Sequence, residues 1–134
     1  MHIAIDGHTI GTQLAGNVTY ASKITEALAT IDADNLYTLY VANVDAENQF
    51  KGRWPNVKVH RLAMGGRIAR QLFSFKSILN KHRPDIFFVQ FNAPPRLRCK
   101  LVNTIHDISF EHRPDTFRWH EAFRMKVSIR RAAR

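Results

Sequence analysis

Four ionisable side chains follow one predicted strand within seven residues. His106, Asp107, Glu111 and His112 come after the segment 100–105, whose residues are typical of a strand. A histidine in this position can donate a hydrogen bond to a sugar hydroxyl or a phosphate, or act as a general acid or base. The spacing matches no H-E-x-x-H or Cys/His motif, so a metal site is disfavoured. For His106 the residues alone leave two roles open, a catalytic or binding role and a structural role that ties two loops together.

A glycine-rich segment, residues 7–16, follows the first predicted strand. Its glycines are Gly7, Gly11 and Gly16, and Asn17 stands in the position of an N-cap for the helical pattern that follows. Backbone N–H groups at the start of a helix favour a phosphate. The spacing matches neither G-x-G-x-x-G nor G-x-x-x-x-G-K-S/T, which disfavours a dinucleotide site and a P-loop. A turn whose residues are kept small for packing explains the glycines equally well.

The other residue types with chemical potential carry no motif. Cys99 lacks the setting of a nucleophile and is interpreted as an inert small hydrophobe. The chain has no G-x-S-x-G elbow. Five further histidines are interpreted as surface or packing residues: His2, His8, His60, His82 and His120.

Strand-like and helical patterns alternate along the chain. Strands are predicted at residues 2–6, 36–42, 57–62, 85–90 and 100–105, and helices at residues 17 to about 31, at 67–81 and from about 117 onward. Continuous apolar runs in the last two strands indicate burial on both faces, as in a parallel sheet. The pattern predicts an α/β fold, with a Rossmann-like, doubly wound, mostly parallel sheet in a single domain of residues 1–134.

In open α/β sheets, ligands bind beyond the carboxyl ends of the strands. Three predicted loops leave such ends: residues 7–16, 91–99 and 106–118. The glycine-rich segment and the segment that contains His106 are therefore both predicted at the edge of the sheet where ligands bind.

The composition fits one domain with a basic surface. The 134 residues are 45% hydrophobic, enough for one core but not for two. Lys and Arg number 20 against 11 Asp and Glu, and the formal net charge of +9 favours a polyanion such as nucleic acid, an anionic membrane face or a phosphorylated substrate. One cysteine and no leader-like N-terminal segment predict a reduced, cytoplasmic protein.

Several segments together resemble a known family. Residues 3–6 open the chain, residues 16–20 (Gly-Asn-Val-Thr-Tyr) lead into the first helix, residues 83–88 run into one strand and residues 101–110 close another. They resemble the N-terminal domain of bacterial family 4 glycosyltransferases of the GT-B fold, along nearly the whole chain. The most specific part is residues 104–110, Thr-Ile-His-Asp-Ile-Ser-Phe.

The resemblance implies a retaining, hexosyltransferase-type enzyme that moves a sugar from a nucleotide-sugar donor to a glycan or lipid-linked acceptor. In that family two Rossmann-like domains face each other across a cleft. The N-terminal domain mainly binds the acceptor, and the C-terminal domain binds most of the donor nucleotide. We therefore expect this chain to be the acceptor-side half, without the donor-binding domain and inactive alone. The resemblance implies no metal and no other cofactor.

Individual residues carry the family's roles onto this sequence. Gly16, with Asn17 beside it, matches the loop glycine whose backbone approaches the donor diphosphate. His106 matches the histidine that contacts the donor sugar near the reacting centre, and Asp107 is its neighbour. The residues that the resemblance places on the acceptor side include Asn92, Arg96, Arg98 and Phe110.

The basic charge leaves further partners to weigh. Membrane-linked acceptors are frequent in the family, and they fit a peripheral contact between basic residues and anionic headgroups, worth about 1 kcal/mol for each residue close to the surface. The basic residues concerned are Arg67, Arg70, Lys81 and Arg83. A helix face exposed to solvent explains the same residues. The alternative function is a basic nucleic-acid-binding or regulatory α/β module. Against nucleic acid, no helix-turn-helix or RNP pattern is present. An isolated half should also expose apolar surface and self-associate.

Overall fold

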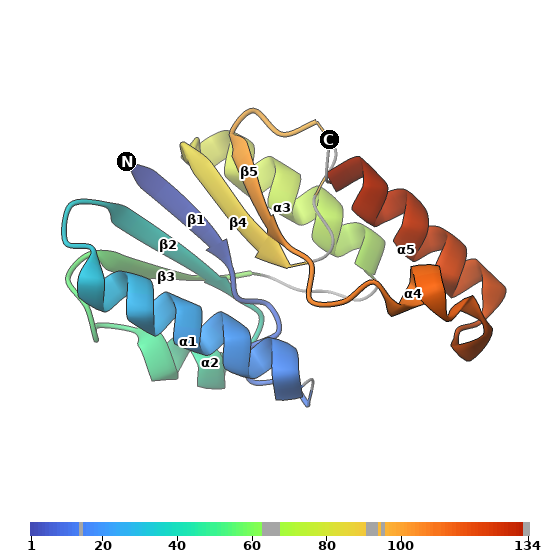
Figure 1. Ribbon diagram of the computed structural model, residues 1–134. Helices are drawn as coiled ribbons and strands as arrows, with labels where there is room; N and C mark the ends of the chain where they lie inside the picture. Colours follow the sequence, from blue (N-terminus) through green and yellow to red (C-terminus); the bar gives the residue numbers. More distant parts are fainter. Residues whose placement is uncertain (14, 63–67, 91–93, 95, 133–134) are drawn as a thin grey trace.

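The computed structural model describes residues 1–13, 15–62, 68–90, 94 and 96–132. Five strands form one parallel sheet: β1 (His2–Asp6), β2 (Leu36–Val41), β3 (Val57–Arg61), β4 (Ile86–Gln90) and β5 (Lys100–Thr104). The helices are α1 (Ala15–Ile31), α2 (Val44–Phe50), α3 (Ile68–His82), α4 (Ser109–His112) and α5 (Trp119–Ala132), with a 3-10 helix η1 at Pro114–Thr116. The predicted α/β, Rossmann-like fold is confirmed, and the described sheet is parallel throughout (Figure 1).

The order of the strands reverses beside β1. The sheet runs β3-β2-β1-β4-β5, because the chain moves outward from β1 to β3 and then returns through α3 to the other side of β1. Ile3 of β1 therefore pairs with Ile86 of β4. Ligands of open α/β sheets bind at such a switch point, beyond the carboxyl ends of the strands. Asp6, Gln90 and Thr104 end β1, β4 and β5 at this edge.

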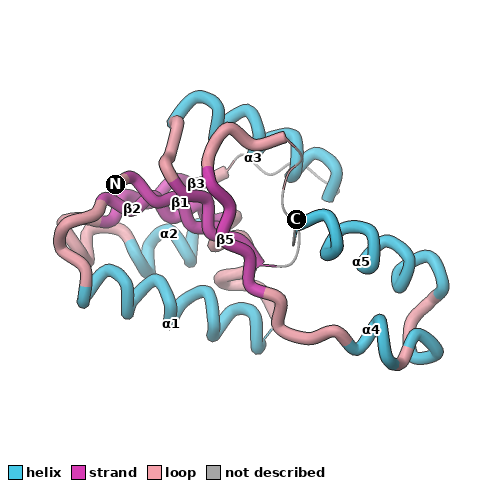
Figure 2. The backbone as a smooth tube through the Cα atoms, turned by 45° about the horizontal axis from the view of Figure 1, so that its top comes forward, coloured by secondary structure: helices cyan, strands magenta, loops and turns pink. Residues whose placement is uncertain are grey.

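Helices cover the sheet from both sides (Figures 1 and 2). The core on the side of α1 and α2 includes Ile5, Leu39 and Phe50. The core on the side of α3 includes Tyr40 and Phe75. Successive side chains of a strand point to opposite faces, so Leu39 and Tyr40 of β2 enter different cores. Burial on both faces explains why the inner strands show no apolar–polar alternation.

Two details of the helix and strand predictions are corrected. α1 begins at Ala15, so Asn17 is its third residue and not its N-cap. β5 is an edge strand, and its Val102 is exposed. The expectation that both faces of β5 are covered was therefore wrong: Leu101 packs against the core on the side of α3, whereas Val102, on the opposite face, is exposed. The residue types of the strand do not reveal this difference.

The short helices lie in stretches for which the sequence predicts no structure. α2 has seven residues and buries only Ala46 and Phe50, a pattern too short to show a helical period. Its start is fixed by Asn43, whose Oδ1 accepts a hydrogen bond from the Ala46 N–H at 2.8 Å. α4 and η1 are shorter still, so an apolar period predicts none of the three.

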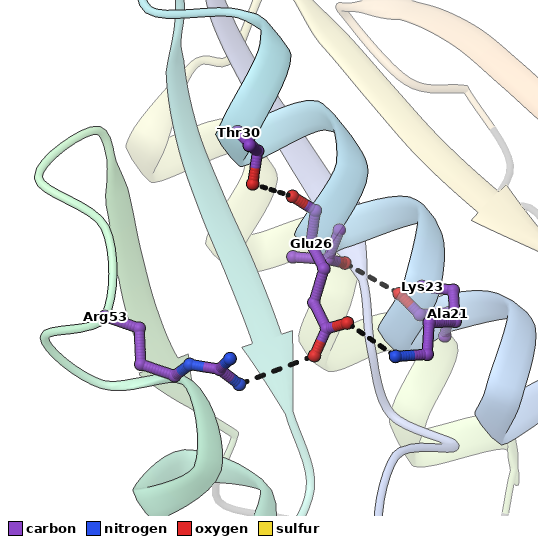
Figure 3. Close-up of polar contacts among 6 residues, drawn as sticks. Ala21, Lys23, Glu26, Thr30 and Arg53 are labelled. Atoms are coloured by element: carbon purple, nitrogen blue, oxygen red, sulfur yellow. Dashed lines mark hydrogen bonds and ion pairs between the residues drawn. The ribbon is translucent and has the colours of Figure 1, made fainter.

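Glu26 connects α1 to the segment that leads into β3 (Figure 3). Its carboxylate lies 2.9 Å from Lys23 Nζ and 3.4 Å from Arg53 Nη1. The hydrogen bond from Lys23 is the main cause that lowers the pKa of Glu26. Exposed ion pairs of this kind add little stability, so the contact serves mainly to orient the segment around Arg53.

The C-terminal helices form a small unit beyond β5 (Figure 1). Phe110 of α4 and Ile129 of α5 are buried there, and α4 and α5 contact each other. Glu111 pairs with Lys126 at 3.4 Å and with Arg130 at 3.1 Å. No helix among the described residues combines the length and apolar character that a membrane crossing requires.

One face of α5 remains uncovered in this chain. Trp119 is 81% exposed, Phe123 is 63% exposed and Val127 is also exposed. The three are spaced by four residues, so they share one side of the helix. A contiguous apolar surface of this kind favours association.

We expect the chain to self-associate through this face. The sedimentation coefficient should rise with protein concentration, and Phe123→Glu should weaken that rise because it places a charge in the apolar stripe. Ile31→Glu, at an exposed residue at the end of α1, is the matched control. A wild-type chain that sediments as a monomer at every concentration would contradict the expectation.

Candidate functional site

His106 stands at the carboxyl edge of the sheet, two residues beyond β5. Its Nε2 lies 2.8 Å from Oε1 of Gln90, the last residue of β4, so the imidazole N–H donates to the amide oxygen. Gln90 is only 6% exposed. A buried amide can be satisfied in few ways, and this contact therefore fixes the imidazole relative to β4. The ring itself remains exposed.

Tyr20 of α1 connects His106 with the glycine-rich segment. The rings of Tyr20 and His106 meet edge to face, with centroids 4.7 Å apart, and the Tyr20 hydroxyl lies 3.0 Å from Thr104 Oγ1. Gly16 precedes Tyr20 by four residues, so both lie on one face of α1, about 6 Å apart along the axis. Because α1 starts at the carboxyl edge, Gly16 is one turn nearer to that edge. The fold thus brings Gly16 and His106 to one corner of the sheet.

Space distinguishes Gly16 from the other glycines of this segment. A Cβ at Gly7 would lie 2.6 Å from Leu39 Cδ1, and Gly11 has a φ of +79° that disfavours any side chain. A Cβ at Gly16 would meet nothing within 4 Å. Packing therefore accounts for Gly7 and Gly11 but leaves Gly16 unexplained.

Asp107 has a local structural role. Its Oδ1 accepts hydrogen bonds from the Ser109 hydroxyl at 2.7 Å and from the Ser109 N–H at 3.0 Å. These bonds, the hydroxyl first, lower the pKa of Asp107 below its ordinary 3.8. The carboxylate is thus ionised at neutral pH and holds the turn that leads into α4, which favours a positioning role over that of a proton donor.

The predicted acceptor residues do not gather at this corner. Arg98 lies two residues before β5, at the opposite end of the strand from His106, where it lines a shallow cavity of about 310 Å³. Arg96 is exposed in the loop before it, with a φ of +55°. Phe110 is 1% exposed, so its ring offers no surface to an acceptor. Asn92 lies outside the described residues.

A second histidine, at the end of β1, escaped the sequence prediction. His8 Nδ1 donates to Asp6 Oδ1 at 2.6 Å, and the His8 N–H donates to the same oxygen at 3.1 Å. Asp6 is 5% exposed. Burial alone would lower the pKa of His8, but the hydrogen bond and charge of Asp6 outweigh burial and raise it. The sequence did carry a signal for this pair: an Asp and a His stand two residues apart at the carboxyl end of a buried strand.

The segment around His8 is firmly held. Gly7 N–H donates to the Tyr40 carbonyl at 2.8 Å, and Asn43 Nδ2 donates to the Ile10 carbonyl at 2.8 Å. Thr9 is buried, and its hydroxyl has no hydrogen-bond partner among the described residues. These hydrogen bonds therefore hold the backbone of the loop after β1 in a defined conformation.

Two imidazoles thus follow the two neighbours of β4 in the sheet: His8, held by a carboxylate, follows β1, and His106, held by an amide, follows β5. Because Nδ1 of His8 is bound to Asp6, its Nε2 is the atom left for a ligand. A histidine that is paired with a carboxylate in this way can take up or release a proton. Among the described residues no group of three side chains could hold a metal ion.

No family model matches the chain, and no curated protein and no solved structure is significantly similar to it. The geometry of the chain's own residues therefore carries the functional argument.

We expect the two glycines to respond in opposite ways to alanine. Gly7→Ala should lower the free energy of unfolding by about 1–3 kcal/mol because its Cβ overlaps the core. Gly16→Ala should leave it unchanged or raise it by about 0.4–1 kcal/mol, since the helical backbone accepts alanine. Urea unfolding measures both, and a larger loss at Gly16 would contradict the geometry.

Asp6→Asn should lower the pKa of His8, because burial then acts without the opposing charge. A pKa that folding raises contributes stability below the unfolded value of about 6.5, and that stability is lost as pH rises through the folded value. The variant should therefore be more destabilised at about pH 6 than at about pH 9. NMR titration of the ring signals checks this, with exposed His120 as internal control; an unchanged pKa of His8 would contradict the pairing.

Proposed function

We propose that this chain is the acceptor-side domain of a retaining glycosyltransferase that transfers a hexosyl-type sugar from a nucleotide-sugar to an acceptor. The observation that carries the proposal is the corner formed by Gly16, Tyr20 and His106 at the carboxyl edge of the sheet. Gly16 and Tyr20 both belong to α1, whereas His106 lies 86 positions beyond Tyr20 in the sequence. Gly16 and His106 match the family's donor-contacting residues. Their convergence supports the resemblance, which alone rests on sequence.

The corner offers groups suited to a nucleotide-sugar. Gly16 and Asn17 lie in the first turn of α1, where backbone N–H groups and the helix dipole favour a diphosphate. The empty space at Gly16 would let phosphate oxygens approach the backbone. His106, fixed by Gln90, presents its exposed ring to a sugar hydroxyl near the reacting carbon.

The acceptor side of the proposal is less supported than the donor side. Arg96 and Arg98 are exposed and cationic, but Arg98 stands at the opposite end of β5 from His106, so the acceptor contacts of the proposal rest on the resemblance alone. Of the basic residues expected to touch anionic headgroups, Lys81 and Arg83 are exposed, whereas Arg67 and the Arg70 side chain lie outside the described residues. A reduced Cys99 fits a cytoplasmic location.

Nucleic-acid binding remains the second candidate because of α5. The exposed aromatic rings of Trp119 and Phe123 are each next in sequence to an exposed arginine, Arg118 and Arg124, and such groups can stack on unpaired bases. Five other aromatic side chains are buried in the two cores and offer no such surface: Tyr37, Tyr40, Phe50, Phe75 and Phe87. Binding to arbitrary nucleic acid that weakens steeply with salt would favour this candidate.

The proposal is tested on the protein expressed from its complete reading frame. His106→Ala should slow release of the nucleoside diphosphate from a nucleotide-sugar about 100-fold or more, as expected for the loss of a hydrogen-bonding or acid–base group at the reacting centre. NMR of the product should show the anomeric configuration of the donor. His112→Ala, at an exposed residue of the same segment, is the matched control. Equal rates for both variants, or no donor consumption by the wild type, would refute the assignment.

A further inference from the structure

Three histidines without a sequence motif line one groove. His2 of β1, His60 of β3 and His82 at the end of α3 surround it together with Lys58, and its volume is about 520 Å³. The lining also includes the first residues of β2, so the groove lies towards the amino edge of the sheet. His106 stands at the opposite, carboxyl edge, and the groove is therefore separate from the candidate glycosyltransferase site.

The rings are held in place by Tyr40 and by one another. His82 Nδ1 lies 2.7 Å from the Tyr40 hydroxyl, with the two rings stacked. The His60 ring meets Tyr40 and His82 edge to face, with centroids 5.6 Å and 5.1 Å away. His2 Nε2 is 2.8 Å from Thr38 Oγ1. The groove thus has walls of fixed orientation.

Several donors in this groove have no partner within the described part of the chain. Nε2 of His82 and both ring nitrogens of His60 make no hydrogen bond there, and Lys58 makes no ion pair. Two separate elements, β3 and α3, therefore present N–H groups to the same space. Half-buried polar groups left in this state are normally satisfied by water or a ligand.

The charges around the groove are mostly of one sign. Burial is the main cause that lowers the pKa of His82, and His60, Lys81 and His2 lower it further. The pKa of His2 is likewise lowered, by burial first and then by Lys58 and the N-terminal amino group, against the opposite effect of Asp85.

Asp85 is the one acidic group that these interactions involve, and its Oδ2 accepts a hydrogen bond from the His2 N–H at 2.7 Å. It lies beside His2, while no described residue that lines the groove is acidic. No acidic side chain of the described lining therefore balances the positive charge of Lys58, and a bound anion would do so.

We propose that this groove binds a small phosphate-bearing ligand and that protonation of His60 and His82 tightens the binding. Phosphate oxygens accept several charge-assisted hydrogen bonds at once, which matches donors that converge from β3 and α3. The volume suits a small molecule rather than a duplex. This inference does not depend on the proposed transferase function, because it uses none of the residues at the carboxyl edge.

Pyrophosphate added to the full chain at about pH 6 tests the site. NMR signals of the His60 and His82 rings should shift, and the lowered pKa of His82 should rise; a rise of one unit means tenfold tighter binding to the protonated form. Exposed His112 should not respond. Shifts at His60 and His82 no larger than that at His112 would overturn the proposal.

Matched variants separate a specific site from general attraction to a basic protein. Lys58→Gln and His60→Gln should each weaken pyrophosphate binding at least about fivefold, whereas Lys100→Gln and His120→Gln, at exposed residues elsewhere, should leave it unchanged. Since Lys58 is exposed, its variant should retain the fold. Equal losses at Lys58 and Lys100 would overturn the proposal.

Two further ligands, a nucleoside diphosphate and a sugar monophosphate, are compared with pyrophosphate. The comparison shows which class of molecule carries the phosphate that the groove binds. Tighter binding of the nucleoside diphosphate would assign the groove to a nucleotide, and tighter binding of the sugar phosphate to a carbohydrate. Failure of both ligands to shift His60 and His82 would reject a phosphate site, without bearing on donor turnover at His106.

Discussion

The pairing of β1 on both of its sides is the constraint on which the rest of the structure depends. Its five residues pair with β2 on one edge, and three of them, Ile3 to Ile5, also pair with β4 on the other, so both halves of the sheet are attached through this strand. Its side chains also enter both cores, Ile5 on the side of α1 and Ala4 on the side of α3. The strand order reverses at β1, so the connections that leave the carboxyl edge run away from this point in both directions and leave it open. The segments that contain His8, Gly16 and His106 lie around this opening.

Much of the fold follows from local pattern. Apolar runs predict the five strands to within about a residue, and the helical spacing of apolar residues predicts α1, α3 and α5. Short helices leave too little pattern for such a prediction, since α2 buries only Ala46 and Phe50. The start of α1 depends on residues before the apolar stripe, which is why Asn17 is inside the helix rather than at its cap.

The candidate sites differ in how far sequence can reach them. Asp6 and His8 are two residues apart, and their pairing needs only that the strand ends at this point of the chain. The contact of His106 with Gln90 needs β4 and β5 in a given register, which pairs Gln90 with Thr104. The groove of His2, His60 and His82 needs the strand order as well, because those residues meet only when β3, β2 and β1 are neighbours and α3 returns beside them. No local motif encodes that meeting.

The two cores also differ in when they can form. The core on the side of α1 and α2 draws its buried residues from positions 5–57, within the first half of the chain. The core on the side of α3 extends to Val89, and the second partner of β1 begins at Ile86. Contacts of such separation close large loops and tend to form late. During synthesis from the N-terminus, three strands and two helices can therefore collapse first, and the edge of β1 that faces β4 stays open until the chain beyond residue 86 has emerged.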